Sequence, residues 1–205
     1  MFPNRWLAYF DILGFSQLIK STHPDIILEL YNEALDLFEN EKKDTGLSSL
    51  HFSDTFIFYS SDDTPESYTW IQLVASKFMH SCLKKHIPMR GAITVGEFYV
   101  DSEKGIYMGK ALIEAYHEAE SQDWIGLILT KSAEEKVVGK YALNPAFHNF
   151  PMVAVPKKNQ LHAYSFKGNT TYLVNILQQM QDKAPDKDKV KYQNTIDHLM
   201  KQSSM

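Results

Sequence analysis

The most informative stretch is residues 7–15, which read Leu-Ala-Tyr-Phe-Asp-Ile-Leu-Gly-Phe. The apolar run predicts a buried strand over residues 7–12, with Asp11 near its end. Alternation places Leu7, Tyr9 and Asp11 on one face of that strand. A carboxylate there must be solvated, hydrogen-bonded or bound to a cation, because burying it unpaired is too costly. Gly14 allows a sharp turn, which would leave phosphate-favouring backbone N–H groups just beyond the carboxylate.

A second acidic residue follows at a predicted hairpin tip. Residues 47–60 read as two short strands joined tightly by Ser53-Asp54. Either aspartate alone is commonly structural, because strand ends and turns recruit Asp. If the first strand pairs beside the hairpin, the two carboxylates converge at one edge of the sheet. Two carboxylates next to phosphate-accepting amides are typical of a divalent-metal site for nucleoside triphosphates.

The rest of the chain alternates predicted helices and strands. Apolar spacing predicts helices over residues 24–39, 64–86, 110–121 and 131–138, strands over 89–100 and 124–129, and a hairpin over 150–166. This order indicates an α+β fold with an antiparallel-rich sheet and helices on one face. Two C-terminal helices are expected over residues 169–182 and 187–201. We therefore divide the chain into a main domain, 1–168, and a helical extension, 169–205.

The composition is that of an ordinary globular protein. The 205 residues carry 21 basic and 25 acidic side chains, a net charge of −4, so no global basic field would hold nucleic acid. The single cysteine, Cys82, excludes an intramolecular disulfide, and its place on an apolar helix face favours an inert core role. The sequence shows neither a signal peptide nor an apolar run long enough to cross a membrane. We therefore expect a cytoplasmic protein that binds neither nucleic acid nor membrane.

These residues resemble the catalytic domains of class III nucleotide cyclases, the adenylate and guanylate cyclases. The family's first metal motif reads Phe-x-Asp-Ile-x-Gly-Phe, and residues 9–15 match it with Tyr9 in place of the first Phe. Its second metal aspartate lies at a hairpin tip after Gly, and Ser53-Asp54 is similar. Residues 90–96, Arg-Gly-Ala-Ile-Thr-Val-Gly, resemble the family's Arg-x-Gly-Ile-x-x-Gly strand. The resemblance runs from about residue 6 to residue 167.

The resemblance implies a ferredoxin-like core that works as a head-to-tail homodimer with active sites at the interface. Asp11 and Asp54, with the carbonyl of Ile12, would hold two Mg²⁺ or Mn²⁺ ions. One ion would activate the ribose 3′-hydroxyl and the other would bind the triphosphate, so that the activated oxygen attacks the α-phosphorus and expels pyrophosphate. The residues implied to line the nucleotide are Tyr9, Phe10, Leu13, Gly14, Phe15, Leu50, His117, Lys157 and Lys158.

The sequence departs from the purine cyclases at four aligned positions. Leu50 stands where they carry a base-reading Lys, and Ile106 where they carry a second base-reading residue, usually Asp or Cys. Ile113 and His117 stand in place of the Asn and Arg that stabilise the transition state. A hydrogen-bonding site loses discrimination when its polar partners become aliphatic, which argues against selectivity for adenine or guanine.

The bacterial pyrimidine cyclases of the Pycsar anti-phage systems are a better match. The sequence resembles them in its Tyr-x-Asp-Ile-x-Gly-Phe motif, its Phe-Ser-Asp hairpin and its Arg-Gly-x-Ile strand. These divergent members of the family make cyclic UMP or cyclic CMP as an infection signal for a separate effector. A small base in a narrow, aromatic-lined pocket would suit Tyr9. We therefore predict a cyclase for UTP or CTP, with UTP placed first.

An active enzyme needs a substitute for the missing arginine. Arg90 is a candidate, although a strand arginine suits a structural ion pair equally well. Lys157 and Lys158 are similar in position to the lysine with which purine cyclases bind the triphosphate. The alternative is that they belong to a solvated loop. His117 could donate when protonated, whereas a histidine on a helix face is usually packed or solvated. Two alternatives to an active pyrimidine cyclase stay open, namely a divergent adenylate cyclase and a catalytically silent nucleotide-sensing module.

Overall fold

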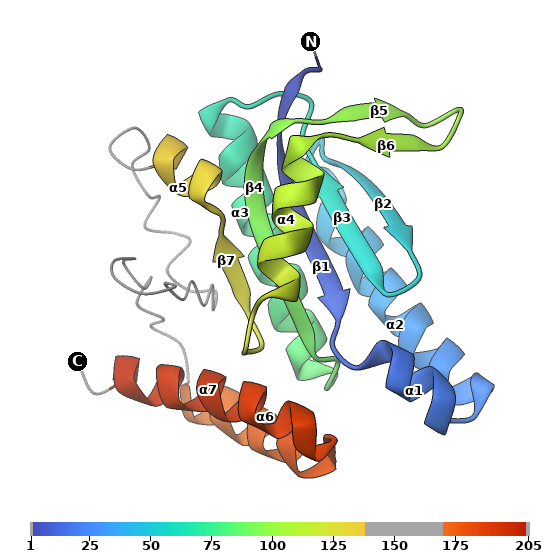
Figure 1. Cartoon of the computed structure of the whole chain (residues 1–205), viewed down its shortest axis with the longest axis vertical. Helices are drawn as coiled ribbons and strands as arrows, with labels where there is room; N and C mark the ends of the chain where they lie inside the picture. The colour runs from blue at the N-terminus through green and yellow to red at the C-terminus, as the bar shows by residue number, and fades with distance from the viewer. Residues whose placement is uncertain (1, 138–169, 204–205) are drawn as a thin grey trace.

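The structure is a computed structural model that describes residues 2–137 and 170–203 (Figure 1). The predicted hairpin over residues 150–166, with Lys157 and Lys158, lies outside these ranges. The elements follow the chain in the order β1 (Asn4–Ile12), α1 (Phe15–Ser21), α2 (Pro24–Lys42), β2 (Ser48–Phe52), β3 (Thr55–Tyr59), α3 (Pro65–Lys84), β4 (Met89–Glu97), β5 (Tyr99–Asp101), β6 (Ile106–Met108), α4 (Lys110–Glu120), β7 (Leu127–Leu129), α5 (Lys131–Val137), α6 (Thr170–Lys183) and α7 (Asp186–Ser203).

Strand β1 is the centre of a mixed five-stranded sheet with the order β2-β3-β1-β4-β7. It pairs antiparallel with both β3 and β4, whereas β4 and β7 are parallel. Every residue from Trp6 to Ile12 is buried, as expected for a central strand that is covered on both faces. The β5–β6 pair forms a separate two-stranded ribbon. The predicted α+β class is confirmed.

Helices cover both faces of this sheet, which corrects the expectation of helices on one face. Helices α2 and α3 lie behind the sheet and α4 lies in front of it (Figure 1). Phe10 of β1 packs against Phe78 of α3, with ring centroids 5.1 Å apart, whereas Tyr9 on the opposite face meets Tyr116 of α4 at 6.1 Å. Because β1 is apolar on both sides, its second face also needs a cover. Helix α4 provides one, burying the small side chains of Ala111, Ala115 and Ala119.

The core between the sheet and helices α2 and α3 is rich in aromatic rings. Phe38 of α2 lies with its ring centroid 4.2 Å from that of Phe58 on β3 and 5.4 Å from that of Phe78. Cys82 of α3 is fully buried in the same core, and burial raises the pKa of its thiol. The thiol is therefore protonated and unreactive, as its position on an apolar helix face predicted.

Helix α3 begins at a dense set of hydrogen bonds. Thr64 precedes Pro65 and its Oγ1 accepts from the backbone N–H of Ser67 at 3.3 Å, an N-cap before a first-turn proline. The Asp62 carboxylate accepts from the Thr64 N–H at 3.0 Å and from the Ser67 hydroxyl at 2.6 Å. Hydrogen bonds from Ser67 and Thr64 lower the pKa of Asp62 to about 2.

The two C-terminal helices pack side by side against one end of the sheet (Figure 1). Thr195 of α7 accepts a hydrogen bond from the Ile125 backbone N–H at 2.9 Å, just before β7. Apolar side chains of both helices join the same core cluster as the sheet. None of the described helices combines the length and the apolar content that crossing a bilayer requires.

Candidate active site

The structure brings Asp11 and Asp54 together at one end of the sheet. Asp11 lies opposite Thr55 in the β1–β3 ladder, and the N–H of Ile12 donates to the Asp54 carbonyl at 3.1 Å. The hairpin tip therefore lies beside the end of β1. Asp11 is buried, with 8% of its surface exposed, and Asp54 is half-buried.

The connection between β2 and β3 holds Asp54 in place. Phe52 pairs with Thr55, so the turn consists of Ser53 and Asp54 alone. Ser53 has φ of 54°, a left-handed conformation that non-glycine residues adopt at a cost. The cyclase motif carries Gly here, and Ser53 takes up the conformation that such a glycine allows.

Arg90 of β4 is the closest charged partner of Asp11. The two residues are paired across the sheet, and Nε and Nη2 of Arg90 donate to Asp11 Oδ2 at 3.0 and 2.9 Å. Arg90 also donates to the Glu120 carbonyl at 3.1 Å and to the Glu120 carboxylate. Four of the five N–H groups of the guanidinium are thus engaged. Of the two roles considered for Arg90, the geometry matches the structural ion pair, which positions Asp11.

Burial outweighs this ion pair in the titration of Asp11. Removal of the carboxylate from water raises its pKa, the Arg90 hydrogen bonds and charge lower it, and the charge of Asp54 raises it again, to about 6 overall. The contribution of Asp54 means that the two carboxylates repel each other in the metal-free protein. A nearby cation would relieve that repulsion.

Tyr9 lies beside Asp11 on the face of the sheet that α4 covers. Its hydroxyl is 3.3 Å from Thr55 Oγ1, and its ring meets Tyr116 edge to face. Burial raises the pKa of Tyr9 to about 12, so the phenol is neutral at physiological pH. Tyr9 therefore forms an aromatic wall next to the two aspartates.

The two other aromatic side chains of the motif, Phe10 and Phe15, are buried in the core. Phe10 is fully buried on the opposite face of β1, between Phe58 and Phe78. Phe15 is also buried, near Tyr31 of α2. The two-residue period of a strand requires this outcome for Phe10, because its neighbours Tyr9 and Asp11 face α4. Phe10 therefore lies on the far side of the sheet from Asp11, whereas Phe15 lies near Tyr31, whose pKa is raised by burial and by the charge of Asp54.

The turn after β1 has the sharp geometry expected of Gly14. Gly14 has φ of 77° and directly precedes α1, and the N–H of Leu13 donates to the Pro88 carbonyl at 2.8 Å. Leu50 of β2 is half-buried and lies opposite Ile57 of β3, which in turn lies opposite Tyr9. Leu50 therefore shares the sheet face of Tyr9.

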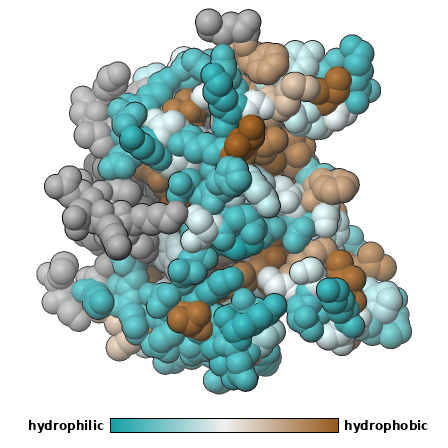
Figure 2. Space-filling view, in the orientation of Figure 1, coloured by the Kyte–Doolittle hydropathy of each residue, from teal (hydrophilic) through white to brown (hydrophobic). Residues whose placement is uncertain are grey.

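The α4 residues aligned with the catalytic Asn and Arg face outward. Ile113 is 59% exposed, and His117 is exposed beside the ring of Tyr116. Ile106 lies apart from them, at the start of β6 in the separate ribbon. Figure 2 shows apolar patches between hydrophilic side chains on this face of the molecule. The large apolar residues exposed on α4, β6 and the hairpin are Ile113, Tyr116, Met108 and Phe52.

Sequence reasoning missed Glu120 and Thr55. Glu120 lies at the end of α4, and its contact with Arg90 spans 30 positions of the chain. No local spacing indicates such a pair. Thr55 could have been found, because it follows Asp54 directly and the register of the predicted hairpin places it opposite Asp11.

The donor set fits a divalent cation through two carboxylates and a strand-end carbonyl. Within residues 2–137 and 170–203, no cluster of three or more His, Cys, Asp and Glu side chains is present. Both Arg90 bonds end on Oδ2 of Asp11, and no hydrogen bond in the described part of the chain reaches its Oδ1 or the Asp54 carboxylate. Carboxylate and carbonyl oxygens are the ligands that Mg²⁺ and Mn²⁺ prefer.

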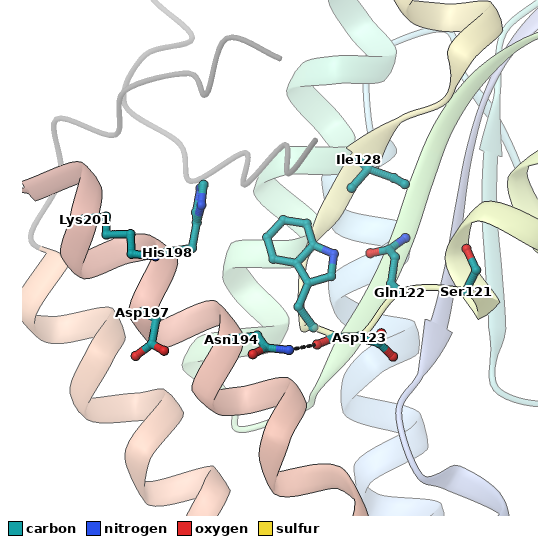
Figure 3. Close-up of a pocket in the computed structure, with 9 residues that line it drawn as sticks. Ser121, Gln122, Asp123, Ile128, Asn194, Asp197, His198 and Lys201 are labelled. Atoms are coloured by element: carbon teal, nitrogen blue, oxygen red, sulfur yellow. Dashed lines mark hydrogen bonds between the residues drawn. The ribbon is translucent and has the colours of Figure 1, made fainter. Parts of the chain in front are cut away.

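A cavity of about 400 Å³ lies elsewhere, between the α4–β7 connection and α7 (Figure 3). Gln122 and Ile128 line one side, and His198 and Lys201 of α7 line the other. Asn194 donates to the Asp123 carbonyl at 2.7 Å across its base. Among the residues that the structure describes, none of those predicted to bind substrate lines this cavity.

Comparison with known proteins supports a cyclase fold through structure alone. The sequence matches no protein-family profile and no curated protein. The catalytic core of a rhodopsin-guanylyl cyclase with converted specificity, solved with ATPαS, aligns with a TM-score of 0.58 at 12% identity over 69% of this chain and 84% of that one. The adenylyl cyclase CyaB from P. aeruginosa aligns with a TM-score of 0.54 at 10% identity, over 67% of this chain and 81% of that one. The monomeric guanylyl cyclase domain of the RhoGC fusion protein from Blastocladiella emersonii aligns with a TM-score of 0.57 at 12% identity, over 66% of this chain and 85% of that one. The chain therefore has the fold of the class III adenylyl and guanylyl cyclase domains.

Proposed function

We propose that this chain is a nucleotide cyclase that converts UTP or CTP into the 3′,5′-cyclic monophosphate and pyrophosphate. The observation that carries the proposal is the meeting of Asp11 and Asp54, where the end of β1 contacts the β2–β3 turn. Two carboxylates that lie together at the end of a strand and a hairpin turn are the kind of donor pair that holds a divalent cation. The cyclase fold supports the same assignment.

Asp11, Asp54 and the carbonyl of Ile12 would hold two divalent cations, Mn²⁺ or Mg²⁺. When bound, these ions supply activation of the ribose 3′-hydroxyl and neutralisation of the triphosphate charge. Arg90 fixes the Asp11 carboxylate through Oδ2 and leaves Oδ1 available. The turn at Gly14 would let the backbone approach the phosphates without a side chain in the way.

The pyrimidine preference rests on the wall beside the aspartates. Tyr9, Ile57 and Leu50 form one row across β1, β3 and β2. The row offers one phenol hydroxyl, already shared with Thr55, and two aliphatic side chains. Such a wall packs against a small base but has no hydrogen-bonding side chain at Leu50 to read a purine edge.

We also propose that the enzyme is a homodimer with its sites at the interface. Arg90 is engaged by Asp11 and Glu120, so the charge that stabilises the transition state has to come from another group. Helix α4 exposes Ile113, Tyr116 and His117, which suits an interface rather than open solvent. Lys157 and Lys158 are the proposed triphosphate-binding residues. Sedimentation of wild type and Ile113→Glu tests this, and a fully active monomer would contradict it.

An assay with each of the four ribonucleoside triphosphates and Mn²⁺ tests the reaction. We expect cyclic UMP or cyclic CMP, abolished in Asp54→Ala and retained in Asp25→Ala, which changes an exposed aspartate at the start of α2. Cyclic AMP as the main product would replace the proposal with a divergent adenylyl cyclase. Triphosphate binding without turnover would indicate a silent nucleotide-sensing module.

The cyclic nucleotide would act as a second messenger in anti-phage defence, through a separate effector protein. Mass spectrometry of nucleotides from infected cells that express wild type or Asp54→Ala tests this role. We expect cyclic pyrimidine nucleotide to accumulate after infection only with wild type. Equal levels with and without phage would argue against an infection signal.

A further inference from the structure

The guanidinium group of Arg90 presents two edges of N–H donors, and a different acidic residue occupies each edge. The edge formed by Nε and Nη2 faces Asp11, and both groups donate to Oδ2, at 3.0 and 2.9 Å. The edge formed by Nη1 and Nη2 faces Glu120, where Nη1 donates to the backbone carbonyl at 3.1 Å and Nη2 donates to the carboxylate. Glu120 therefore binds Arg90 twice, through its main chain and through its side chain.

The contact between Arg90 and Asp11 departs from the usual geometry of such a pair. An arginine frequently meets a carboxylate as a fork, in which two parallel N–H groups reach the two oxygens. Here both N–H groups converge on Oδ2 instead. Oδ1 accepts no hydrogen bond in the described part of the chain, and it is not among the fully enclosed unpaired oxygens there. Oδ1 is thus open to a ligand, although Arg90 carries the donors for a fork.

The position of Glu120 is set by the packing of α4. Glu120 is the last residue of that helix, its neighbour Ala119 is fully buried, and α4 packs against β1 and β4. The last carbonyl groups of a helix have no partner within the helix and attract cations, which accounts for the bond from Arg90 to the Glu120 carbonyl. The outer edge of the guanidinium is therefore anchored on a packed helix, and it cannot slide along the Asp11 carboxylate without breaking these two bonds.

We propose that Glu120 is a positioning residue of the metal site, which confines Arg90 to Oδ2 of Asp11 and keeps Oδ1 free for a divalent cation. Without the Glu120 carboxylate, Nη2 loses one acceptor, and the guanidinium can turn until Nε and Nη2 each meet one oxygen of Asp11. Such a fork would occupy Oδ1 and compete with the cation. The consequence for the cation rests on the proposed function, whereas the hold of Glu120 on Arg90 does not.

The negative charge of Glu120 could also favour a cation without any positioning, and two substitutions separate these effects. The Glu120 side chain is 41% exposed, so solvent screens its long-range attraction. Glu120→Gln removes the charge and keeps an acceptor oxygen, whereas Glu120→Ala removes both. Loss of the charge alone weakens cation binding equally in the two variants. Loss of positioning weakens it in Glu120→Ala far more than in Glu120→Gln.

Titration of the whole protein with Mn²⁺, without nucleotide, measures cation binding through the electron paramagnetic resonance signal of the free ion. The binding that Asp11→Asn removes belongs to this site. We expect Glu120→Ala to weaken that binding at least about tenfold, the effect usual for groups that orient a metal ligand. Glu120→Gln should stay within about threefold of wild type, because only a screened charge is lost. The control is Glu135→Ala on α5, which removes a carboxylate that is 68% exposed and should leave the affinity unchanged.

Crystal structures of metal-free wild type and Glu120→Ala measure the geometry directly. In Glu120→Ala we expect Arg90 to donate to both oxygens of Asp11. An Arg90 that still meets Oδ2 alone would overturn the proposal, as would equal Mn²⁺ affinity in Glu120→Ala and wild type, or equal losses in Glu120→Ala and Glu120→Gln. Mn²⁺ bound at Asp11 by a wild type that cyclises no nucleotide would leave this inference standing and remove only the proposed function.

Discussion

Replacement of Arg90 by Leu should destabilise the protein more than removal of any exposed ion pair. The guanidinium holds Asp11, which is 8% exposed, and both side chains of the pair are 11% exposed. Breaking a buried ion pair by removing one partner costs about 3–5 kcal/mol, because the remaining carboxyl group is left buried without its partner and either keeps its charge or has to take up a proton. We expect Arg90→Leu to lower the free energy of unfolding by about 3–4 kcal/mol. That is a large share of the 5–15 kcal/mol typical of a domain.

A double-mutant cycle isolates the contribution of the Asp11–Arg90 pair. Asp11→Asn keeps an acceptor for Arg90, so we expect it to cost about 1–2 kcal/mol. In the double variant the amide leaves no buried charge behind, and the combined loss should fall short of the sum by about 2 kcal/mol. Urea unfolding followed by circular dichroism, at pH 7.5 and without divalent ions, measures all three values.

The matched control is Lys110→Ala, which removes the Lys110–Glu97 pair, where the lysine side chain is 86% exposed. Such pairs contribute about 1 kcal/mol or less. If Arg90→Leu costs no more than Lys110→Ala, Arg90 does not hold Asp11 in solution. A coupling energy near zero in the cycle would refute the same reading, even if both single variants are unstable.

Three further experiments, each with a control or a variant of its own, test other parts of the structure by the same unfolding measurement. Ser53→Gly should stabilise the protein by about 1 kcal/mol, since it removes the left-handed strain at φ 54°, and Ser53→Ala should give no such gain. Gly91→Ala should lower the free energy of unfolding by about 2–3 kcal/mol, because the new Cβ would lie 2.4 Å from the Tyr9 carbonyl oxygen. Gly96→Ala on the same strand is the control, since its Cβ would meet its nearest atom at 3.7 Å and the stability should hardly change. Hydrogen bonds lower the pKa of Asp62 to about 2, so its contribution to the free energy of unfolding is present above pH 4 and is lost as the pH falls towards 2. After allowance for solvent screening we expect this contribution to be about 1 kcal/mol and to be absent in Asp62→Asn. An unchanged pH dependence of stability in Asp62→Asn would contradict this prediction.

Local patterns in the sequence were sufficient to predict most elements. The apolar run of β1 and the Ser53-Asp54 turn lie where the sequence predicted them, because strand periodicity and turn chemistry are properties of adjacent residues. Pro24 and Pro65 mark the starts of α2 and α3 for the same reason. The approach of Asp11 to Asp54 was also predictable, because it needs only neighbouring strands in register.

The contacts that complete the candidate site depend on distant parts of the chain, and only the tertiary structure shows them. Arg90 reaches Asp11 across 79 positions and Glu120 across 30, and no spacing within one element connects the three. Helix α4 lies on the second face of the sheet because β1 is apolar on both sides and both have to be covered. The order of helices and strands along the chain does not show which helix covers which face. Asp188 approaches Gly14 only because α7 packs against the end of the sheet. The sequence therefore determined the elements and the two acidic residues, while long-range packing decided which charges face them.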